Sequence, residues 1–155
     1  MEQPFADDIN AIIRQSREVA IRYEQYQIDL DHLMLALTQV EESSARKLLV
    51  DLGCDIKALA HLIEKTFTPF KERKDGNIPL TRLAESVLKG TFMEAYDLTE
   101  NELFEVLQAQ SRPTNRPVQS EHMLLSILLV EDHPVVKNMK AHWGVDYQKV
   151  KDAFS

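Results

Sequence analysis

Two acid–histidine pairs, Asp31-His32 and Glu121-His122, are the residues of this sequence whose types are best suited to chemistry. A carboxylate beside an imidazole occurs in general acid–base sites and among metal ligands. Neighbouring residues on a helix point about 100° apart, however, so the two members of a pair do not converge easily on one atom. The pairs therefore favour histidines that lie at helix N-termini and hydrogen-bond to the backbone, since buried polar groups normally find such partners. A helical enzyme that uses the acid–histidine pairs stays open as an alternative.

The other polar residues do not form a recognisable catalytic or metal motif. His61, His133 and His142 are not spaced as metal ligands, and Cys54 has no second cysteine to pair with. Neither a nucleophile elbow nor a phosphate-binding loop can be built from four scattered glycines. Acidic neighbours such as Asp7-Asp8 are interpreted as a solvated face. The sequence thus predicts no catalytic residue, no metal and no cofactor.

Composition narrows the class of protein. The chain has 155 residues, 44% of them hydrophobic, and a formal charge of −7. This length fits one compact domain, and neither half of the chain is basic, which argues against a nucleic-acid surface. The longest apolar run, Met123 to Val130, is far shorter than the roughly 20 residues of a membrane span. The single cysteine and the lack of a signal-peptide pattern after Met1 predict a cytoplasmic protein without membrane contact.

The two acid–histidine pairs lie in two copies of one segment. Residues 31–37, Asp-His-Leu-Met-Leu-Ala-Leu, return as residues 121–127, Glu-His-Met-Leu-Leu-Ser-Ile, at an offset of 90. A second series lines one face of a predicted helix at residues 5–25 and returns at an offset of 75. Its members Phe5, Ile9, Ile12, Ile13, Ser16 and Ala20 correspond to Leu80, Ala84, Val87, Leu88, Thr91 and Ala95. Two independent matches in the same order indicate a duplicated unit.

Each unit is expected to contain four short helices. In the first unit these cover about residues 5–25, 30–39, 44–52 and 55–67, and residues 68–77 form a linker. Expected helix starts are Asp29 or Asp31, Ser43 or Ser44, and Asp55, and Gly53 is expected as a left-handed stop.

The last two helices return at an offset of 91, with Pro134 in a first turn. At this offset Leu48, Leu49, Leu52, Gly53, Asp55, Leu59 and Ile63 correspond to Met139, Lys140, Trp143, Gly144, Asp146, Val150 and Phe154.

An insertion distinguishes the second unit. The offset rises from 75 to 90 between Ala95 and His122, so this unit holds 15 additional residues, at about 97–118. Residues 99–102, Thr-Glu-Asn-Glu, form a capping-box pattern, which predicts a helix from about Thr99 to Gln110. Residues 111–118, with two prolines, are expected to form a loop.

Together these features resemble the Clp repeat, the N-terminal domain of ClpA/ClpC-type AAA+ unfoldases. The matching residues are Phe5, Ile9 and Ala20, the two acid–histidine segments, the series Ala45, Leu48, Leu49, Leu52, Gly53 and Asp55, and Ile78-Pro79-Leu80-Thr81. The resemblance implies an all-α fold of two four-helix Clp repeats with pseudo-twofold symmetry. A single Clp N-domain would span residues 1–155, with repeat one at 4–67, the linker at 68–77, and repeat two, including its helical insertion, at 78–154.

The resemblance also implies binding without chemistry. Domains of this family dock substrate proteins and adaptor proteins for a Clp-type ATP-dependent unfoldase or protease chaperone. Expected partners include AAA+ ATPase modules and a ClpP-type peptidase, if the chain is part of a longer one. A stand-alone Clp-repeat accessory or regulatory protein is an alternative.

The resemblance further implies where a ligand would bind. In the ClpC branch each repeat has a pocket for phosphorylated arginine, built in part by a threonine at the start of the first helix and the glutamate before the histidine. The second repeat has these residues as Thr81 and Glu121, whereas the first has Ala6 and Asp31. A carboxylate holds a guanidinium bidentately, and a helix N-terminus holds a phosphoryl group.

Overall fold

A computed structural model describes residues 7–67, 78–96 and 118–154, which are helical without any β-strand within these ranges. The first repeat contains α1 (Asp7–Arg22), α2 (Leu30–Gln39), α3 (Ser44–Asp51) and α4 (Ile56–Glu64). The second contains α5 (Arg82–Tyr96), α7 (Ser120–Leu128), α8 (Pro134–Trp143) and α9 (Tyr147–Phe154). The predicted all-α class is confirmed. The linker at 68–77 and the predicted helix at 99–110 lie outside the described residues.

Side-chain caps define the helix starts, as the sequence predicts. Asp29 precedes α2 and accepts a hydrogen bond from the Leu30 N–H. Ser43 caps α3, and Asp55 caps α4 by accepting from the Ala58 N–H at 3.1 Å. These oxygens satisfy N–H groups that have no partner inside the helix, and each cap typically contributes about 1 kcal/mol to stability.

The first helix ends earlier than its apolar pattern predicts. Instead of continuing to Gln25, α1 stops at Arg22, because Glu24 adopts a left-handed conformation with φ of 55°. The Gln25 N–H then donates to the Ala20 carbonyl at 2.8 Å, and the Glu24 N–H donates to the Ile21 carbonyl. This is the Schellman arrangement, which usually uses glycine, and so a glutamate at this position gives no signal in the sequence.

The third helices of the two repeats align differently from the prediction. The buried side chain of α8 that corresponds to Leu49 of α3 is Met139, at an offset of 90; both are 0% exposed, whereas Lys140 is exposed. After each helix the same backbone bond forms: the Cys54 N–H donates to the Leu49 carbonyl, and the Val145 N–H donates to the Met139 carbonyl. Pairing Leu49 with Lys140 was therefore wrong. The one-residue difference is absorbed between Met139 and Gly144, at the end of α8.

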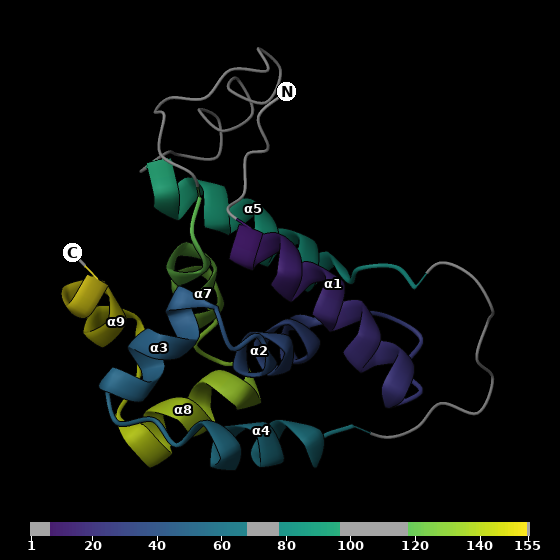
Figure 1. Ribbon diagram of the computed structural model, residues 1–155, viewed down its shortest axis with the longest axis horizontal. Helices are drawn as coiled ribbons and strands as arrows, with labels where there is room; N and C mark the ends of the chain where they lie inside the picture. Colours follow the sequence, from purple (N-terminus) through teal and green to yellow (C-terminus); the bar gives the residue numbers. More distant parts are fainter. Residues whose placement is uncertain (1–6, 68–77, 97–117, 155) are drawn as a thin grey trace.

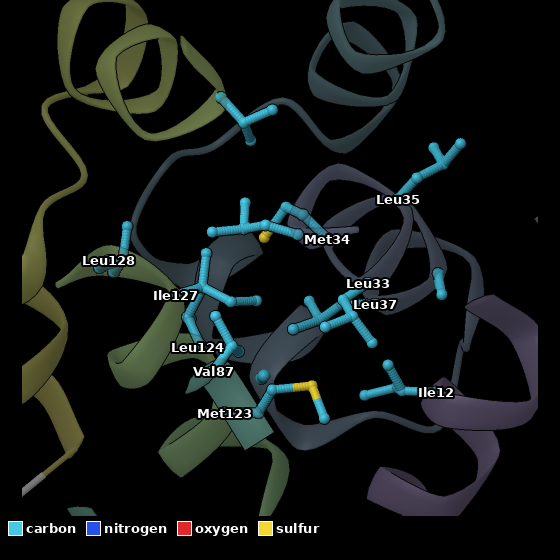
Figure 2. Close-up of a cluster of buried hydrophobic side chains, with 14 of the residues drawn as sticks. Ile12, Leu33, Met34, Leu35, Leu37, Val87, Met123, Leu124, Ile127 and Leu128 are labelled. Atoms are coloured by element: carbon cyan, nitrogen blue, oxygen red, sulfur yellow. The ribbon is translucent and has the colours of Figure 1, made fainter. Parts of the chain in front are cut away.

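Two central helices, α2 and α7, are buried along most of their length. Residues 32–38 of α2 and 123–128 of α7 are all buried, as expected for helices that are enclosed on every side. Figure 2 shows side chains of both helices gathered in one cluster together with Ile12 of α1 and Val87 of α5. In Figure 1, α5 lies above this pair, α1 slants down to its right, and α4 and α8 lie below it.

The two repeats follow one plan and exchange contacts. In each repeat the first helix packs on the second, as α1 on α2 and α5 on α7. Each first helix also contacts the central helix of the other repeat, because α5 touches α2 and α1 touches α7. The same exchange relates the α4–α8 and α3–α9 contacts. The pseudo-twofold arrangement implied by the resemblance is consistent with this pattern, and one core serves both repeats.

The corrected alignment of α8 can be tested by paired substitutions. Met139→Ala is expected to lower the free energy of unfolding by about 2–5 kcal/mol, because it leaves a cavity in a closed core. Lys140→Ala, one residue further on an exposed face, is expected to change it by less than about 0.5 kcal/mol. Urea unfolding followed by circular dichroism gives both values. A cost for Lys140→Ala equal to that for Met139→Ala would contradict the alignment.

Candidate functional site

His32 and His122 occupy equivalent positions in the two repeats. Each is the third residue of a central helix, and its side chain accepts a hydrogen bond from the backbone N–H of the residue that precedes the helix. The Nδ1 atom of His32 accepts from the Asp29 N–H at 2.8 Å. The Nδ1 atom of His122 accepts from the Gln119 N–H at 3.0 Å. These are the reciprocal bonds of a capping box, with histidine in the place usually taken by glutamate or glutamine. The prediction of histidines hydrogen-bonded at helix N-termini is confirmed.

Aromatic rings cover both imidazoles. Phe67 stacks on His32 with ring centroids 4.7 Å apart and planes 5° from parallel. Phe154 meets His122 edge to face, with centroids 5.1 Å apart. Burial lowers the pKa of both histidines, more than the neighbouring carboxylates Asp31 and Glu121 raise it. Since each Nδ1 accepts an amide hydrogen, each ring is neutral and carries its proton on Nε2.

This arrangement leaves the imidazoles poorly placed for chemistry. Nδ1 is occupied in both, and Nε2 of His32 is buried without a hydrogen-bond partner among the described residues. Within the same residues no group of three or more His, Cys, Asp or Glu side chains is arranged to hold a metal ion. Burial, and secondarily Asp55, raises the pKa of the Cys54 thiol to about 11, which keeps the thiol protonated and unreactive at neutral pH.

Thr81 joins the start of α5 to the start of α2. Its hydroxyl accepts from the Ala84 N–H at 3.0 Å and donates to Oδ1 of Asp29, the cap of α2, at 2.7 Å. A short parallel bridge aligns the two segments, with the Ile28 N–H donating to the Pro79 carbonyl and the Thr81 N–H donating to the Ile28 carbonyl. Thr81 of the second repeat is therefore paired with the acid–histidine helix of the first repeat.

Glu121 lies at a second junction of helix starts, formed by α1, α3 and α7. Its carboxylate accepts a short hydrogen bond from the Ser44 hydroxyl, and its side chain is nearly buried. The Ser120 hydroxyl donates to Asp8 of α1 at 2.6 Å and accepts from the Ala45 N–H at 3.0 Å. Ser44 also approaches Asp8, at 3.1 Å. Here the acid–histidine helix of the second repeat meets the first helix of the first repeat.

The described contacts thus do not bring Thr81 and Glu121 together. Thr81 meets Asp29, with Asp31 two residues further along α2, whereas Glu121 meets Ser44. The Asp31 carboxylate accepts from the His32 N–H at 3.0 Å, and its side chain is 20% exposed. The first junction joins the starts of α2 and α5, and the second joins the starts of α1 and α3 to that of α7, so both junctions cross between the repeats.

Three residues of the second junction were not predicted as site residues from the sequence. Asp8, interpreted as part of a solvated face, is half-buried and accepts from the Ser120 hydroxyl and the Ser44 N–H. Ser44 and Ser120 are the other two. The available signal was weak, because serine at a helix start is common and does not show which distant helix it meets.

The second repeat holds another polar group where the first is apolar. Glu94 of α5 accepts from the Tyr147 hydroxyl at 2.8 and 2.9 Å and pairs with Lys151 at 3.6 Å. At the equivalent positions the first repeat has Val19, which is buried, and Ile56. The two repeats therefore share a backbone plan and differ in side-chain chemistry.

None of the helices in the described ranges combines the length and apolar character needed to span a bilayer.

Neutral, buried histidines predict a particular pH dependence of stability. Their pKa is lower in the folded chain than the ordinary value of 6.5, so only the unfolded chain takes up protons as the pH falls past that value. Their contribution is therefore complete above pH 6.5 and is lost below it, with a slope of at most about 1.4 kcal/mol per pH unit for each histidine.

We expect His32→Gln/His122→Gln to flatten this dependence between about pH 5.5 and 7.5, because glutamine keeps an acceptor at the third helix position but does not titrate. Chemical unfolding at several pH values measures the slope for both chains. Identical slopes in the two chains would contradict the assignment.

The comparisons with known proteins agree with the geometry. The sequence model of the Clp repeat (R) N-terminal domain family matches residues 4–103. Comparison with curated proteins gave no match.

Among solved structures, the chain is similar to the N-terminal domain of Hsp104 from Candida albicans, with a TM-score of 0.66, 16% identity, and coverage of 97% of this chain and 89% of that one. It is similar to the N-domain of ClpV from Vibrio cholerae, with a TM-score of 0.70, 14% identity, and coverage of 97% and 82%. It also resembles the N-terminal domain of the caseinolytic protease associated chaperone ClpD from Arabidopsis thaliana, with a TM-score of 0.61, 12% identity, and coverage of 97% and 91%.

At these identities the structural likeness shows a shared fold, and the family match carries the assignment. That match begins before α1 and extends beyond α5, so it includes the first repeat, one acid–histidine helix and the entry to the second repeat. The chain belongs to the Clp repeat N-terminal domain family.

Proposed function

We propose that this chain is the substrate- and adaptor-docking N-domain of a Clp-type ATP-dependent unfoldase. The observation that carries the proposal is the family match over residues 4–103, supported by the fold likeness to N-domains of Hsp104, ClpV and ClpD. Its partners would be substrate proteins, adaptor proteins, AAA+ ATPase modules and a ClpP-type peptidase, in the cytoplasm.

The described polar groups support a role without catalysis. Both imidazoles bond to backbone N–H groups and are covered by aromatic rings. The helical-enzyme alternative requires at least one of them to reach a substrate, and their pKa values, lowered by burial, reflect enclosure instead. A stand-alone Clp-repeat accessory protein would bind in the same way, and a Walker motif encoded beyond Ser155 would distinguish the two.

The docking proposal predicts recognition of unfolded chains. Reduced, carboxymethylated lactalbumin, labelled with a fluorophore, is expected to bind with a Kd between about 1 μM and 1 mM, which corresponds to about −8 to −4 kcal/mol. Native lactalbumin is the matched control because it has the same sequence in a folded state, and it is expected not to bind. Fluorescence anisotropy gives both affinities. Equal behaviour of the two forms, or ATP turnover by the purified chain, would overturn the proposal.

The two helix-start junctions are the proposed ligand positions. One would use Thr81 and the free N–H groups of α5 for a phosphoryl group, with Asp31 for a guanidinium. The other would use Glu121, after displacement of its bond to Ser44. Phosphoarginine is the ligand that fits this combination of an anion-binding helix start and a carboxylate.

This assignment predicts an effect of single hydroxyl and carboxylate changes. Thr81→Val and Asp31→Asn are each expected to weaken binding of an arginine-phosphorylated peptide by about tenfold, the loss of one charge-assisted hydrogen bond. Thr81→Ser keeps the hydroxyl and is the matched control. Isothermal titration against phosphorylated and unphosphorylated peptides measures the effect, with thermal melts to check folding. If the parent chain binds both peptides equally, phosphoarginine is not the ligand.

A further inference from the structure

An open groove lies at the surface of the second repeat, between the end of α7, α8 and the start of α9. Its volume is about 640 Å³, and its apolar lining includes Leu128 and Val136, which are 1% and 4% exposed. Its charged residues are Glu131, Asp146, Lys137 and Lys140. Neither helix-start junction is part of it.

An arginine occupies the equivalent place in the first repeat. Arg46 of α3 donates from Nε to the carbonyl of Thr38, in the last turn of α2, at 2.9 Å. At an offset of 90, Thr38 corresponds to Leu128, and Arg46 corresponds to Val136. The same offset of 90 relates the first residues of α3 and α8, which are Ser44 and Pro134. In the second repeat, the end of α7 therefore lacks an arginine at the position from which Arg46 reaches the end of α2.

The chemistry of the groove favours a guanidinium. The end of a helix is its negative pole. At the end of α7 the Leu129 and Val130 N–H groups already donate to carbonyls of the last turn, and the carbonyl that corresponds to the acceptor of Arg46 is that of Leu128. Glu131 and Asp146 add two carboxylates to the lining of the groove, and Asp146 also accepts from the Lys149 N–H at 2.9 Å. Lys137 has the counterpart Lys47 beside Arg46 in the first repeat, so a lysine at this position is compatible with a bound guanidinium.

We propose that the groove bounded by Leu128, Val136, Glu131 and Asp146 binds an arginine side chain of a partner polypeptide. The guanidinium takes the position that Arg46 takes in the first repeat, donating to the end of α7, and its methylene groups lie on Leu128 and Val136. This inference rests on the proposed docking function and names the side chain that one docking surface recognises.

The two repeats supply a reciprocal test. Val136→Arg places in the groove the side chain that the first repeat already holds there, and Arg46→Val opens the equivalent place. N-acetyl-arginine amide is titrated into the isotope-labelled chain, and amide resonances in α8 and at the start of α9 are followed. N-acetyl-lysine amide controls for charge alone, and N-acetyl-glutamate amide tests the two lysines as an alternative acid-binding site.

The parent chain is expected to give saturable shifts with the arginine derivative at least about tenfold stronger than with the lysine derivative, equal to about 1.4 kcal/mol. Val136→Arg is expected to abolish these shifts, and Arg46→Val to add a second set in α3. Stronger shifts with the glutamate derivative, unchanged binding by Val136→Arg, or no saturable shift would each overturn the proposal.

Anisotropy with carboxymethylated lactalbumin separates this inference from the docking function. Loss of affinity in Val136→Arg supports the groove as a docking surface. If Val136→Arg binds carboxymethylated lactalbumin as tightly as the parent chain does, the groove proposal is overturned and the docking function stands. If the parent chain does not bind it, both proposals are refuted.

Discussion

The N–H groups at the starts of two buried helices impose the main constraint on this fold. Most residues of α2 and α7 are buried, and the first N–H groups of a helix have no partner within it. A buried donor that is left unsatisfied costs roughly 1–3 kcal/mol. The chain meets the need with side chains of fixed geometry. Histidine accepts from the residue before each helix, and groups from the other repeat complete both junctions. The residues that look most like catalysts are thereby committed to structure.

Periodicity and capping residues predicted the helices well. The bounds of α2 were predicted without error, and Ser43, Asp55 and Pro134 stand at helix starts as expected. These features are local, so a few neighbouring residues determine them. Two local features were not predicted. Glu24 adopts a left-handed conformation, which nothing in its residue type indicates. An extra residue near the end of α8 changes the equivalent of Leu49 from Lys140 to Met139.

The ligand junctions were harder to predict, because they join residues far apart in the sequence. Thr81 and Glu121 belong to one repeat, and the resemblance to the Clp repeat implied one shared pocket. In the structure their hydroxyl and carboxylate contact the other repeat, at Asp29 and Ser44. Offsets between repeats show which residues are equivalent. They do not show whether equivalent helices pair within a repeat or across repeats, and this depends on packing of the whole core.

The exchange of contacts between repeats bears on how such a domain arose. A single repeat would leave the starts of its first two helices without the groups that complete them here, and would expose one side of its central helix. Two separate copies would cover each other's exposed sides through the same contacts, as an isologous dimer does. The contacts between the two repeats are thus those that an isologous dimer of one repeat would have. Two repeats in one chain need not have identical side chains. Arg46 of the first repeat corresponds to Val136 of the second, and Val19 corresponds to Glu94.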